Sequence, residues 1–207
     1  MSYYAEDDLS LCDKNDLEEH IGRVKAVFEK TVMSTVGVKT YYYRIDPEAS
    51  STSKGFWFVN LSEEGFVEHE VTDISLYDTS DQTHLSWFTV PKTTGRSVWL
   101  SPYLTENLDV LVFFYNVPIF KDDEFIGVIG IEIDYNTIVA FVDNISLFEN
   151  GYAFINDDEG NLLYHPRFSV AELTGDQTIP APDGLVSDDK YLSYSRNSKA
   201  SGVAAFT

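Results

Sequence analysis

The sequence has few of the residues on which several common classes of protein depend. Its 207 residues include one cysteine, Cys12, which excludes an intrachain disulfide and a cysteine-rich zinc site. Its four histidines are scattered without paired spacing, so we expect no metal site. Lysine and arginine total 14 against 34 aspartates and glutamates, and the net charge of −20 argues against binding nucleic acid or an anionic membrane surface.

Long apolar runs and enzyme motifs are also missing. The longest apolar runs, near residues 110–115 and 125–131, are too short to cross a bilayer, and the N-terminus lacks the pattern of a signal peptide. Two alternatives follow: a cytosolic protein, or an excised piece of a longer one. No P-loop, dinucleotide fingerprint or Gly-x-Ser-x-Gly elbow occurs, so we expect neither an enzyme nor a cofactor.

What the sequence does contain is apolar and aromatic surface. Hydrophobic residues make up 43% of the chain and aromatic residues 14%, which is enough for a substantial core and excludes disorder. The length suits one large domain or two small ones.

Hydrophobic spacing predicts the elements of the first two thirds of the chain. Apolar residues at steps of three and four from Leu17 to Val32 predict a helix, with Asn15 as its cap. The nearly continuous apolar segments 109–120 and 125–134 predict a buried hairpin. The other predicted elements are strands at 38–45, 56–60 and 66–68, a short helix at 83–88, a turn at 91–95, and an extended segment at 99–103 interrupted by Pro102.

The last third repeats a similar pattern on a smaller scale. Asp134 is expected to cap a helix to residue 145, with Ile138, Phe141, Val142 and Ile145 on its inner face. The strands predicted after it are 152–156, 161–165, 190–195 and 202–207. Because the sequence stops on an apolar β segment, we expect the second module to be truncated. The predicted division is a helical segment 1–37, a module 38–147 and a module 148–207.

Six short motifs occur in an order that is typical of one family. They are Tyr42-Tyr43-Arg44-Ile45-Asp46-Pro47, Trp87-Phe88, Trp99-Leu100-Ser101-Pro102-Tyr103, Tyr115-Asn116-Val117-Pro118-Ile119, Gly127-Val128-Ile129-Gly130-Ile131-Glu132-Ile133-Asp134, and Gly151-Tyr152-Ala153-Phe154 through Tyr164-His165-Pro166. Over residues 15–207 the chain resembles the extracytoplasmic double-Cache sensor domain of bacterial transmembrane receptors.

This resemblance implies a fold, a location and a function. The implied fold is α+β, a long N-terminal helix followed by two PAS-like modules with central antiparallel sheets, the second incomplete here. The membrane-distal module would bind a small ligand, and flanking helices absent from this chain would anchor it in the cell membrane, with a homodimer possible. We expect a diguanylate cyclase or histidine kinase output rather than a chemoreceptor.

One departure from the family bears on the ligand. Members that bind amino acids carry an arginine two residues before the tryptophan of the Trp-aromatic pair, and Leu85 holds that place here. Ser80 and Glu132 also replace the tyrosine and aspartate of that pattern. Without an arginine to hold a carboxylate, we expect a neutral or cationic ligand.

The candidate ligand-binding residues are aromatic and acidic. Glu132 is the strongest acidic candidate, because a carboxylate on an apolar strand is costly unless it is paired. Arg44 is expected to form a structural salt bridge with Asp46 or another acid. The full set of candidates is Trp87, Phe88, Trp99, Tyr103, Tyr115, Glu132, Trp57, Asp109 and His84.

Other interpretations remain open at this stage. Each aromatic ring could instead belong to the core, and Asp109 could simply be solvated. Aromatic rings with carboxylates also suit a carbohydrate-binding or glycan-active protein, although no carboxylate pair is singled out by its spacing.

Overall fold

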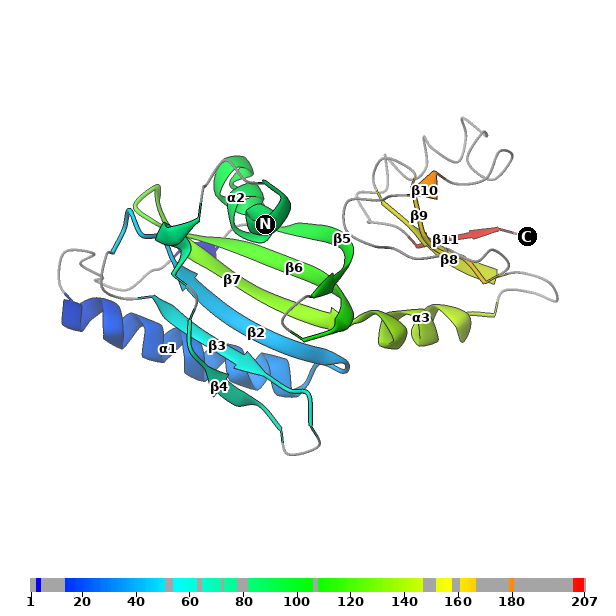
Figure 1. The fold of residues 1–207 in the computed structure, drawn as a ribbon, viewed down its shortest axis with the longest axis horizontal. Coiled ribbons are helices and arrows are strands. Elements are labelled where there is room, and N and C mark those ends of the chain that lie inside the picture. The colour runs from blue at the N-terminus through cyan, green and yellow to red at the C-terminus, as the bar shows by residue number, and fades with distance from the viewer. Residues whose placement is uncertain are drawn as a thin grey trace. The chain divides into compact units, whose positions relative to one another are not determined.

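The computed structural model describes most of the first 166 residues and two short later segments (Figure 1). The described residues are 3–4, 14–50, 54–62, 65–71, 73–77, 82–105, 108–146, 152–157, 161–166, 179–180 and 203–206. They form two compact units, one of Met1–Leu100 with Phe114–Ile133, the other of Ser101–Phe113 with Asp134–Thr207. The predicted boundaries near residues 37 and 147 stay a prediction.

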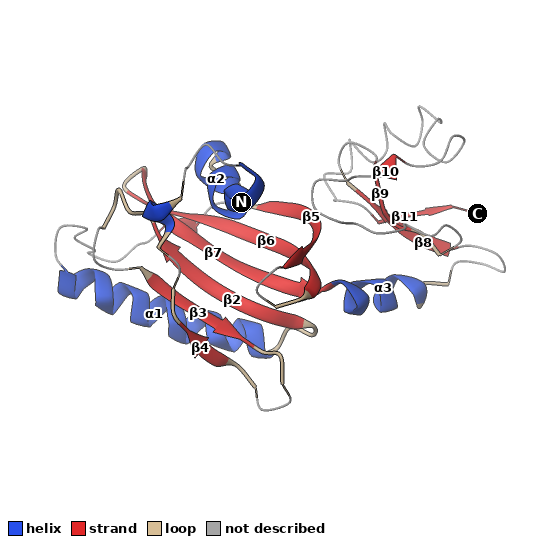
Figure 2. Cartoon of the chain, viewed as in Figure 1, coloured by secondary structure: helices blue, strands red, loops and turns tan. Residues whose placement is uncertain are grey.

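The larger sheet, which is mainly antiparallel and drawn red in Figure 2, makes up most of the first unit, although residues 101–105 and 110–113 of its strands belong to the second unit. The strand order is β1-β6-β7-β2-β3-β4, and β5 pairs with β6. The strands are β1 (Tyr3–Tyr4), β2 (Val38–Ile45), β3 (Gly55–Val59), β4 (Val67–His69), β5 (Val98–Thr105), β6 (Val110–Lys121) and β7 (Glu124–Asp134). The predicted α+β class, with an N-terminal helix and an antiparallel sheet, is confirmed.

Helix α1 (Lys14–Met33) covers one face of this sheet (Figure 1). Leu17 and Val32 of the predicted apolar stripe are buried, and Phe28 packs edge-on against Tyr41 with ring centroids 5.9 Å apart. The prediction of Asn15 as cap is wrong. The helix begins at Lys14, so Asn15 lies inside its first turn.

Helix α2 (Gln82–Thr94) is longer than predicted. The expected turn at 91–95 is wrong, because the helix continues through Pro91 to Thr94. Pro91 has no backbone N–H and cannot donate the helical hydrogen bond to the carbonyl of Trp87. Because Pro91 is buried, its packing compensates for this missing hydrogen bond. The helix ends where Gly95, with a φ of 63°, donates to the carbonyl of Pro91 at 2.9 Å. A short 3₁₀ helix, η1 (Ile74–Leu76), precedes α2.

The hairpin of β6 and β7 is confirmed. Asp122 and Asp123 occupy its two-residue turn with φ values of 48° and 66°, which is the conformation of a type I′ turn. The predicted interruption at Pro102 is wrong, since β5 runs unbroken through it. Among the described strands β5 pairs only with β6, and proline is tolerated at a sheet edge because its missing N–H is not needed there.

The second unit contains helix α3 and a smaller sheet. The helix is α3 (Tyr135–Asp143), and the sheet has the order β10-β9-β8-β11. Its strands are β8 (Tyr152–Asn156), β9 (Asn161–Tyr164), β10 (Ile179–Pro180) and β11 (Val203–Phe206). The predicted strand at 190–195 lies outside the described residues.

Helix α3 begins as predicted but buries only part of its predicted inner face. The Asp134 carboxylate accepts a hydrogen bond from the Thr137 backbone N–H at 2.9 Å, so Asp134 is the cap. Val142 joins a buried cluster, against which Ile138 packs. Phe141 and Ile145 are exposed, so the prediction that they face inward is wrong. The buried cluster contains Phe113, Val142, Ala153, Ile155 and Leu163.

Candidate functional site

Strand β2 separates two groups of side chains because neighbours on a strand alternate between faces. Tyr41 and Tyr43 face α1, where the Tyr43 hydroxyl lies 3.0 Å from Nε2 of the buried His20. Thr40, Tyr42 and Arg44 therefore point to the opposite face. The ladder places Glu132 opposite Thr40, and both Gly130 and Trp57 opposite Tyr42. We call this surface the polar face and define it by Thr40, Tyr42, Arg44, Trp57, Asn116 and Glu132.

Tyr42 connects β2, β6 and α2 on the polar face. Its hydroxyl donates a hydrogen bond of 2.6 Å to Oδ1 of Asn116, a contact between residues 74 positions apart in the sequence. Its ring meets the indole of Trp87 at 5.3 Å in an edge-to-face arrangement, so α2 is in contact with this face.

Two glycines of the Gly-x-x-Gly segment make room for these contacts. A Cβ at Gly130 would lie 2.5 Å from both the Asn116 Oδ1 and the Tyr42 ring. A Cβ at Gly127 would lie 2.1 Å from the carbonyl oxygen of Arg44. The motif is therefore required by close packing against β2 and β6.

Arg44 is buried on the polar face and forms no ion pair with the residues that the structure describes. Its guanidinium carbon lies 5.8 Å from the centroid of the Tyr42 ring and 5.7 Å from that of Trp57. Its Nε and Nη1 atoms have no hydrogen-bond partner. Burial lowers the pKa of Arg44 to about 10, while Tyr42 and Glu132 act in the opposite direction, so the side chain is charged at neutral pH.

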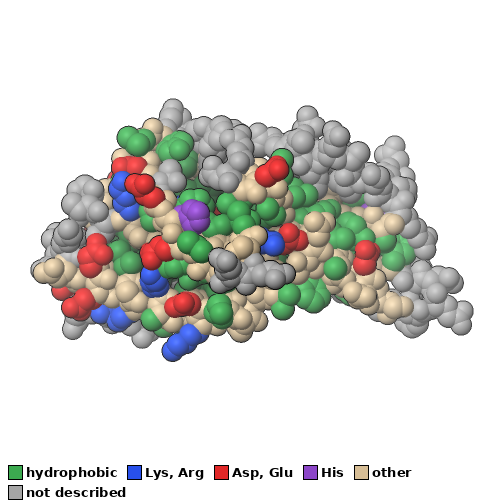
Figure 3. Space-filling model, turned by 60° about the horizontal axis from the view of Figure 1, so that its bottom comes forward, with side chains coloured by type: hydrophobic (Ala, Val, Ile, Leu, Met, Phe, Trp, Pro, Cys, Tyr) green, Lys and Arg blue, Asp and Glu red, His purple; other side chains and the backbone are tan. Residues whose placement is uncertain are grey.

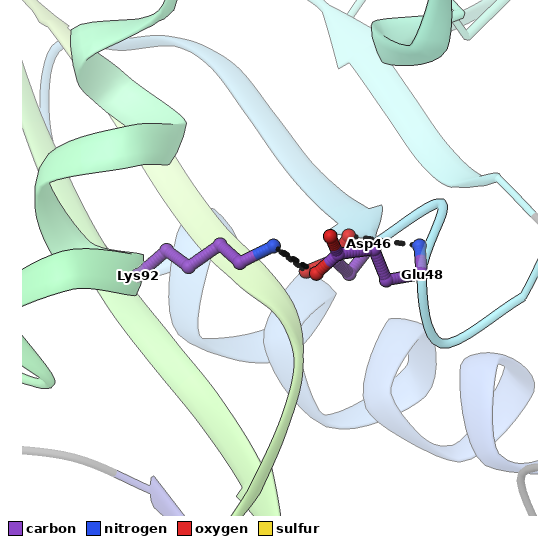
Figure 4. Close-up of polar contacts among 3 residues, drawn as sticks. All are labelled: Asp46, Glu48 and Lys92. Carbon is purple, nitrogen blue, oxygen red and sulfur yellow. Dashed lines mark hydrogen bonds and ion pairs between the residues drawn. The ribbon is translucent and has the colours of Figure 1, made fainter. Parts of the chain in front are cut away.

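The salt bridge expected between Arg44 and Asp46 is not formed, because Asp46 pairs with Lys92 (Figure 4). The Lys92 ammonium lies 2.6 Å from Asp46 and 2.7 Å from Glu48. Burial acts to lower the pKa of Lys92, but the hydrogen bonds and charges of the two acids outweigh it and raise the pKa. Lys92 thus ties the last turn of α2 to the end of β2.

Glu132 is the buried acid of the polar face, with 8% of its surface exposed. Burial raises its pKa to about 7, and the neighbouring Thr40 hydroxyl and the charge of Arg44 act against that rise. Its Oε2 atom has no hydrogen-bond partner. The group can therefore accept a hydrogen bond when ionised, or donate one when protonated.

Unsatisfied polar atoms are concentrated on the polar face. Within the part of the chain that the structure describes, the buried atoms without a hydrogen bond on this face are Arg44 Nε and Nη1, Asn116 Nδ2 and Glu132 Oε2. Leaving such an atom unpaired costs about 1–3 kcal/mol, so native proteins rarely tolerate a group of them without a reason. The donors and the acid are suited to binding a polar molecule.

Comparison with known proteins identifies the family. The sequence profile of the Cache domain family dCache_1 matches residues 13–201. The chain belongs to this family. Cache sensor domains of this type are extracellular, ligand-binding and non-enzymatic modules of signal-transduction receptors, so the predicted sensor class is confirmed.

Two curated relatives of this Cache domain are chemotaxis proteins. This chain is 24% identical over 86 residues to the methyl-accepting chemotaxis protein PctB of Pseudomonas aeruginosa. It is 27% identical over 100 residues to the methyl-accepting chemotaxis protein McpC of Bacillus subtilis. These matches cover 42% and 48% of this chain but only 14% and 15% of the relatives.

Solved structures share the fold at low sequence identity. The chemotaxis structure named methyl-accepting chemotaxis protein X has a TM-score of 0.57 and 16% identity, over 84% of this chain and 65% of that one. The extracellular domain of mmHK1S-Z2, described as a histidine kinase, has a TM-score of 0.54 and 20% identity, over 87% and 67%. Because the curated relatives are chemotaxis proteins, the expected preference against a chemoreceptor is not supported, and neither is the carbohydrate alternative.

Three of the predicted site residues of the Cache domain lie on or against the polar face. They are Glu132, Trp57 and Trp87. Phe88 is the neighbour of Trp87, but it is buried in a core cluster with Ile74, Leu85 and Val128. Its position is explained by packing alone.

The other predicted residues do not join this group. Trp99 and Tyr115 pack on each other at 4.7 Å, and strand alternation directs Tyr115 away from the face that carries Asn116. Tyr103 and Asp109 belong to the second unit and are exposed, Asp109 in a turn with a φ of 52°. His84 lies in α2, and its side chain is outside the described residues.

Sequence reasoning did not include Thr40, Tyr42 and Asn116 among the candidates and gave Arg44 a structural role. The alternation of Thr40, Tyr42 and Arg44 along one strand was a usable signal, since it puts polar groups on one face of a buried sheet. The contact with Asn116 had no local signal.

The described part of the chain contains neither a metal cluster nor a helix that could span a membrane. No group of three histidine, cysteine or acidic side chains there is arranged to hold a metal ion, and Figure 3 shows acidic side chains scattered over the visible face rather than gathered together. Within the same residues, no helix has the length and apolar character of a membrane span.

Proposed function

We propose that this Cache domain senses a small polar molecule that binds on the polar face of the sheet, beside α2. The observation that carries the proposal is the group of buried, unpaired polar atoms on that face. A ligand that pairs with them would recover the free energy that their burial costs. This gain is specific to a polar guest, because an apolar one would leave the atoms unpaired.

The aromatic residues around this group suit a ligand site. Tyr42, Trp57 and Trp87 offer rings beside the charged groups, and binding sites commonly combine apolar walls with a few polar anchors. We expect a ligand that is neutral or cationic overall. The net charge of −20 disfavours the approach of an anion, and Glu132 is available to an amine or N–H group.

Signalling would follow from a shift between two states with different affinities for the ligand. Tyr43, which follows Tyr42 in β2, contacts His20 of α1 at 3.0 Å, so a change at the polar face has a short route to that helix. We propose that α1 passes the change to a membrane anchor and an output domain of the chemotaxis or histidine kinase kind. A homodimer would suit this transmission.

A thermal-shift screen tests the proposal. Amines, purines, pyrimidines, organic acids and sugars are added to the purified chain, and a ligand at about 100 times its Kd should raise the melting temperature by roughly 5–10 °C. Trp87→Ala and Glu132→Ala should lose this response while remaining folded, and Trp99→Ala should keep it.

The proposal fails on either of two outcomes. One is that no compound in any class raises the melting temperature. The other is that an active compound stabilises Trp87→Ala and Glu132→Ala as strongly as the natural chain.

A further inference from the structure

We infer that helix α2 is a movable cover of the polar face, which is fixed at its C-terminal end by the ion pair of Lys92 with Asp46 and bends at Pro91. The consequence of this inference rests on the proposed function. Arg44 and Glu132 are buried, so a ligand reaches them only when an element that covers this face moves. The bending itself is a property of the ligand-free chain and is tested without a ligand.

The middle of α2 lies against the polar face. The Trp87 indole meets the Tyr42 ring at 5.3 Å. Phe88 is buried in a cluster with Val128, which lies on the same face of β7 as Glu132 because side chains alternate along a strand. These contacts are apolar and have no preferred direction. They keep α2 on the sheet, but they fix its position less firmly than an ion pair does.

The C-terminal end of α2 is fixed by Lys92 (Figure 4). The Lys92 ammonium lies 2.6 Å from the Asp46 carboxylate, which is 3% exposed, and 2.7 Å from the Glu48 carboxylate, which is 83% exposed. Losing the cation is strongly unfavourable for a buried carboxylate and nearly neutral for an exposed one. Asp46 is also held by its neighbours. Its carboxylate accepts a hydrogen bond from the Glu48 backbone N–H at 3.0 Å, and its own N–H donates to the Ile126 carbonyl at 2.9 Å.

The helix is weakened next to this fixed end. Pro91 has no N–H to donate to the carbonyl of Trp87, and a proline inside a helix is a common site of bending. The Thr89 hydroxyl donates to the carbonyl of Leu85 at 3.0 Å, a type of contact that also often bends helices. The weak segment therefore separates the part of α2 that covers the polar face from the part that Lys92 fixes.

Helix geometry sets the movement that such a bend produces. Trp87 precedes Pro91 by four positions, which is about 6 Å along the helix axis. A bend of about 20° at Pro91 moves this part of the helix by roughly 2 Å. A gap of that size removes most of the attraction between the Trp87 and Tyr42 rings, so a modest bend is enough to uncover the polar face.

Hydrogen exchange of the folded, ligand-free chain tests the fixed end. Amide exchange in α2 is expressed relative to that in β7 of the same variant, so that a uniform loss of stability does not count. Lys92→Met, and Asp46→Asn, which can still accept the hydrogen bond from Glu48, should each speed up exchange in α2 at least about tenfold relative to β7. Glu48→Gln, at the exposed acid, is the matched control and should stay within about threefold.

Replacement of Pro91 by alanine should have the opposite effect on α2. Alanine restores the N–H that the helix lacks opposite the carbonyl of Trp87 and is the residue most favourable to a helix. Exchange in α2 should slow about threefold or more relative to β7. Pro102→Ala, at a second buried proline, should leave this ratio unchanged.

Two results would overturn the inference. One is an unchanged ratio of exchange in α2 to that in β7 for either Lys92→Met or Asp46→Asn, and if Lys92→Met does not fold, Asp46→Asn decides alone. The other is an unchanged or faster relative exchange in Pro91→Ala. Because no ligand is present, neither result bears on the proposed function, which the thermal-shift screen tests separately.

Discussion

Replacing Arg44 and Glu132 together by methionine should raise the melting temperature of the ligand-free chain by roughly 3–10 °C and abolish its response to ligand. Both residues are buried on the polar face with unpaired polar atoms. Exchanging buried charged groups for well-packed apolar side chains is often neutral or stabilises a protein by about 1–4 kcal/mol. A functional site commonly carries such a cost in stability.

An exposed pair of the same residue types provides the control. Lys25 and Glu68 form a surface salt bridge of 3.0 Å, and their replacement by methionine should change stability by at most about 1 kcal/mol. If the Arg44 and Glu132 double variant instead melts several degrees below the natural chain, these residues hold the fold together and do not form a binding site.

The second large effect is a pH dependence that Glu132→Gln should remove. Folded Glu132 keeps its proton up to a pKa of about 7, whereas the unfolded chain releases it near the ordinary value of 4.5. Between these values the folded state binds more protons, so the contribution of Glu132 to stability is fully present below pH 4.5 and is lost as pH rises through 7. The loss is about 3 kcal/mol, and glutamine has no proton to release in this range.

The measurement is the difference in unfolding free energy between the two proteins from pH 4.5 to 8. The natural chain should lose about 3 kcal/mol relative to Glu132→Gln over this range. Glu70→Gln, at an exposed position, controls for the general effect of removing an acid and should show a nearly constant difference. A constant difference for Glu132→Gln as well would mean that Glu132 is solvated or paired in the folded chain.

The elements were predictable from sequence where local patterns decide the structure. The spacing of apolar residues by three and four positions predicted α1. The polar turn at Asp122 and Asp123, between two apolar segments, predicted the hairpin of β6 and β7. The errors fall where tertiary packing overrides a local rule. Pro91 remains inside helix α2 because it is buried. Pro102 remains inside β5 because, among the described strands, β5 pairs only with β6, and a proline at a sheet edge needs no N–H for pairing.

The candidate site was predictable only in part. Glu132 stood out because an acid on an apolar strand is costly, and Trp87 because of its motif. A salt bridge was predicted for Arg44 because the nearest acid in the sequence is Asp46. The residue that pairs with Asp46 instead is Lys92, which lies in the part of α2 beyond the predicted helix end at residue 88. The contact of Tyr42 with Asn116 depends on pairing between strands far apart in the chain, which no local pattern contains.

The three tryptophans allow the most direct test of where a ligand binds. Trp57 and Trp87 lie on or against the polar face, and Trp99 packs on Tyr115 instead. Each indole N–H gives a separate NMR resonance, which can be assigned by single replacement with phenylalanine. A compound that raises the melting temperature should shift the resonances of Trp57 and Trp87 and leave that of Trp99 in place. A shift at Trp99 with the other two unchanged would contradict the placement of the ligand on the polar face.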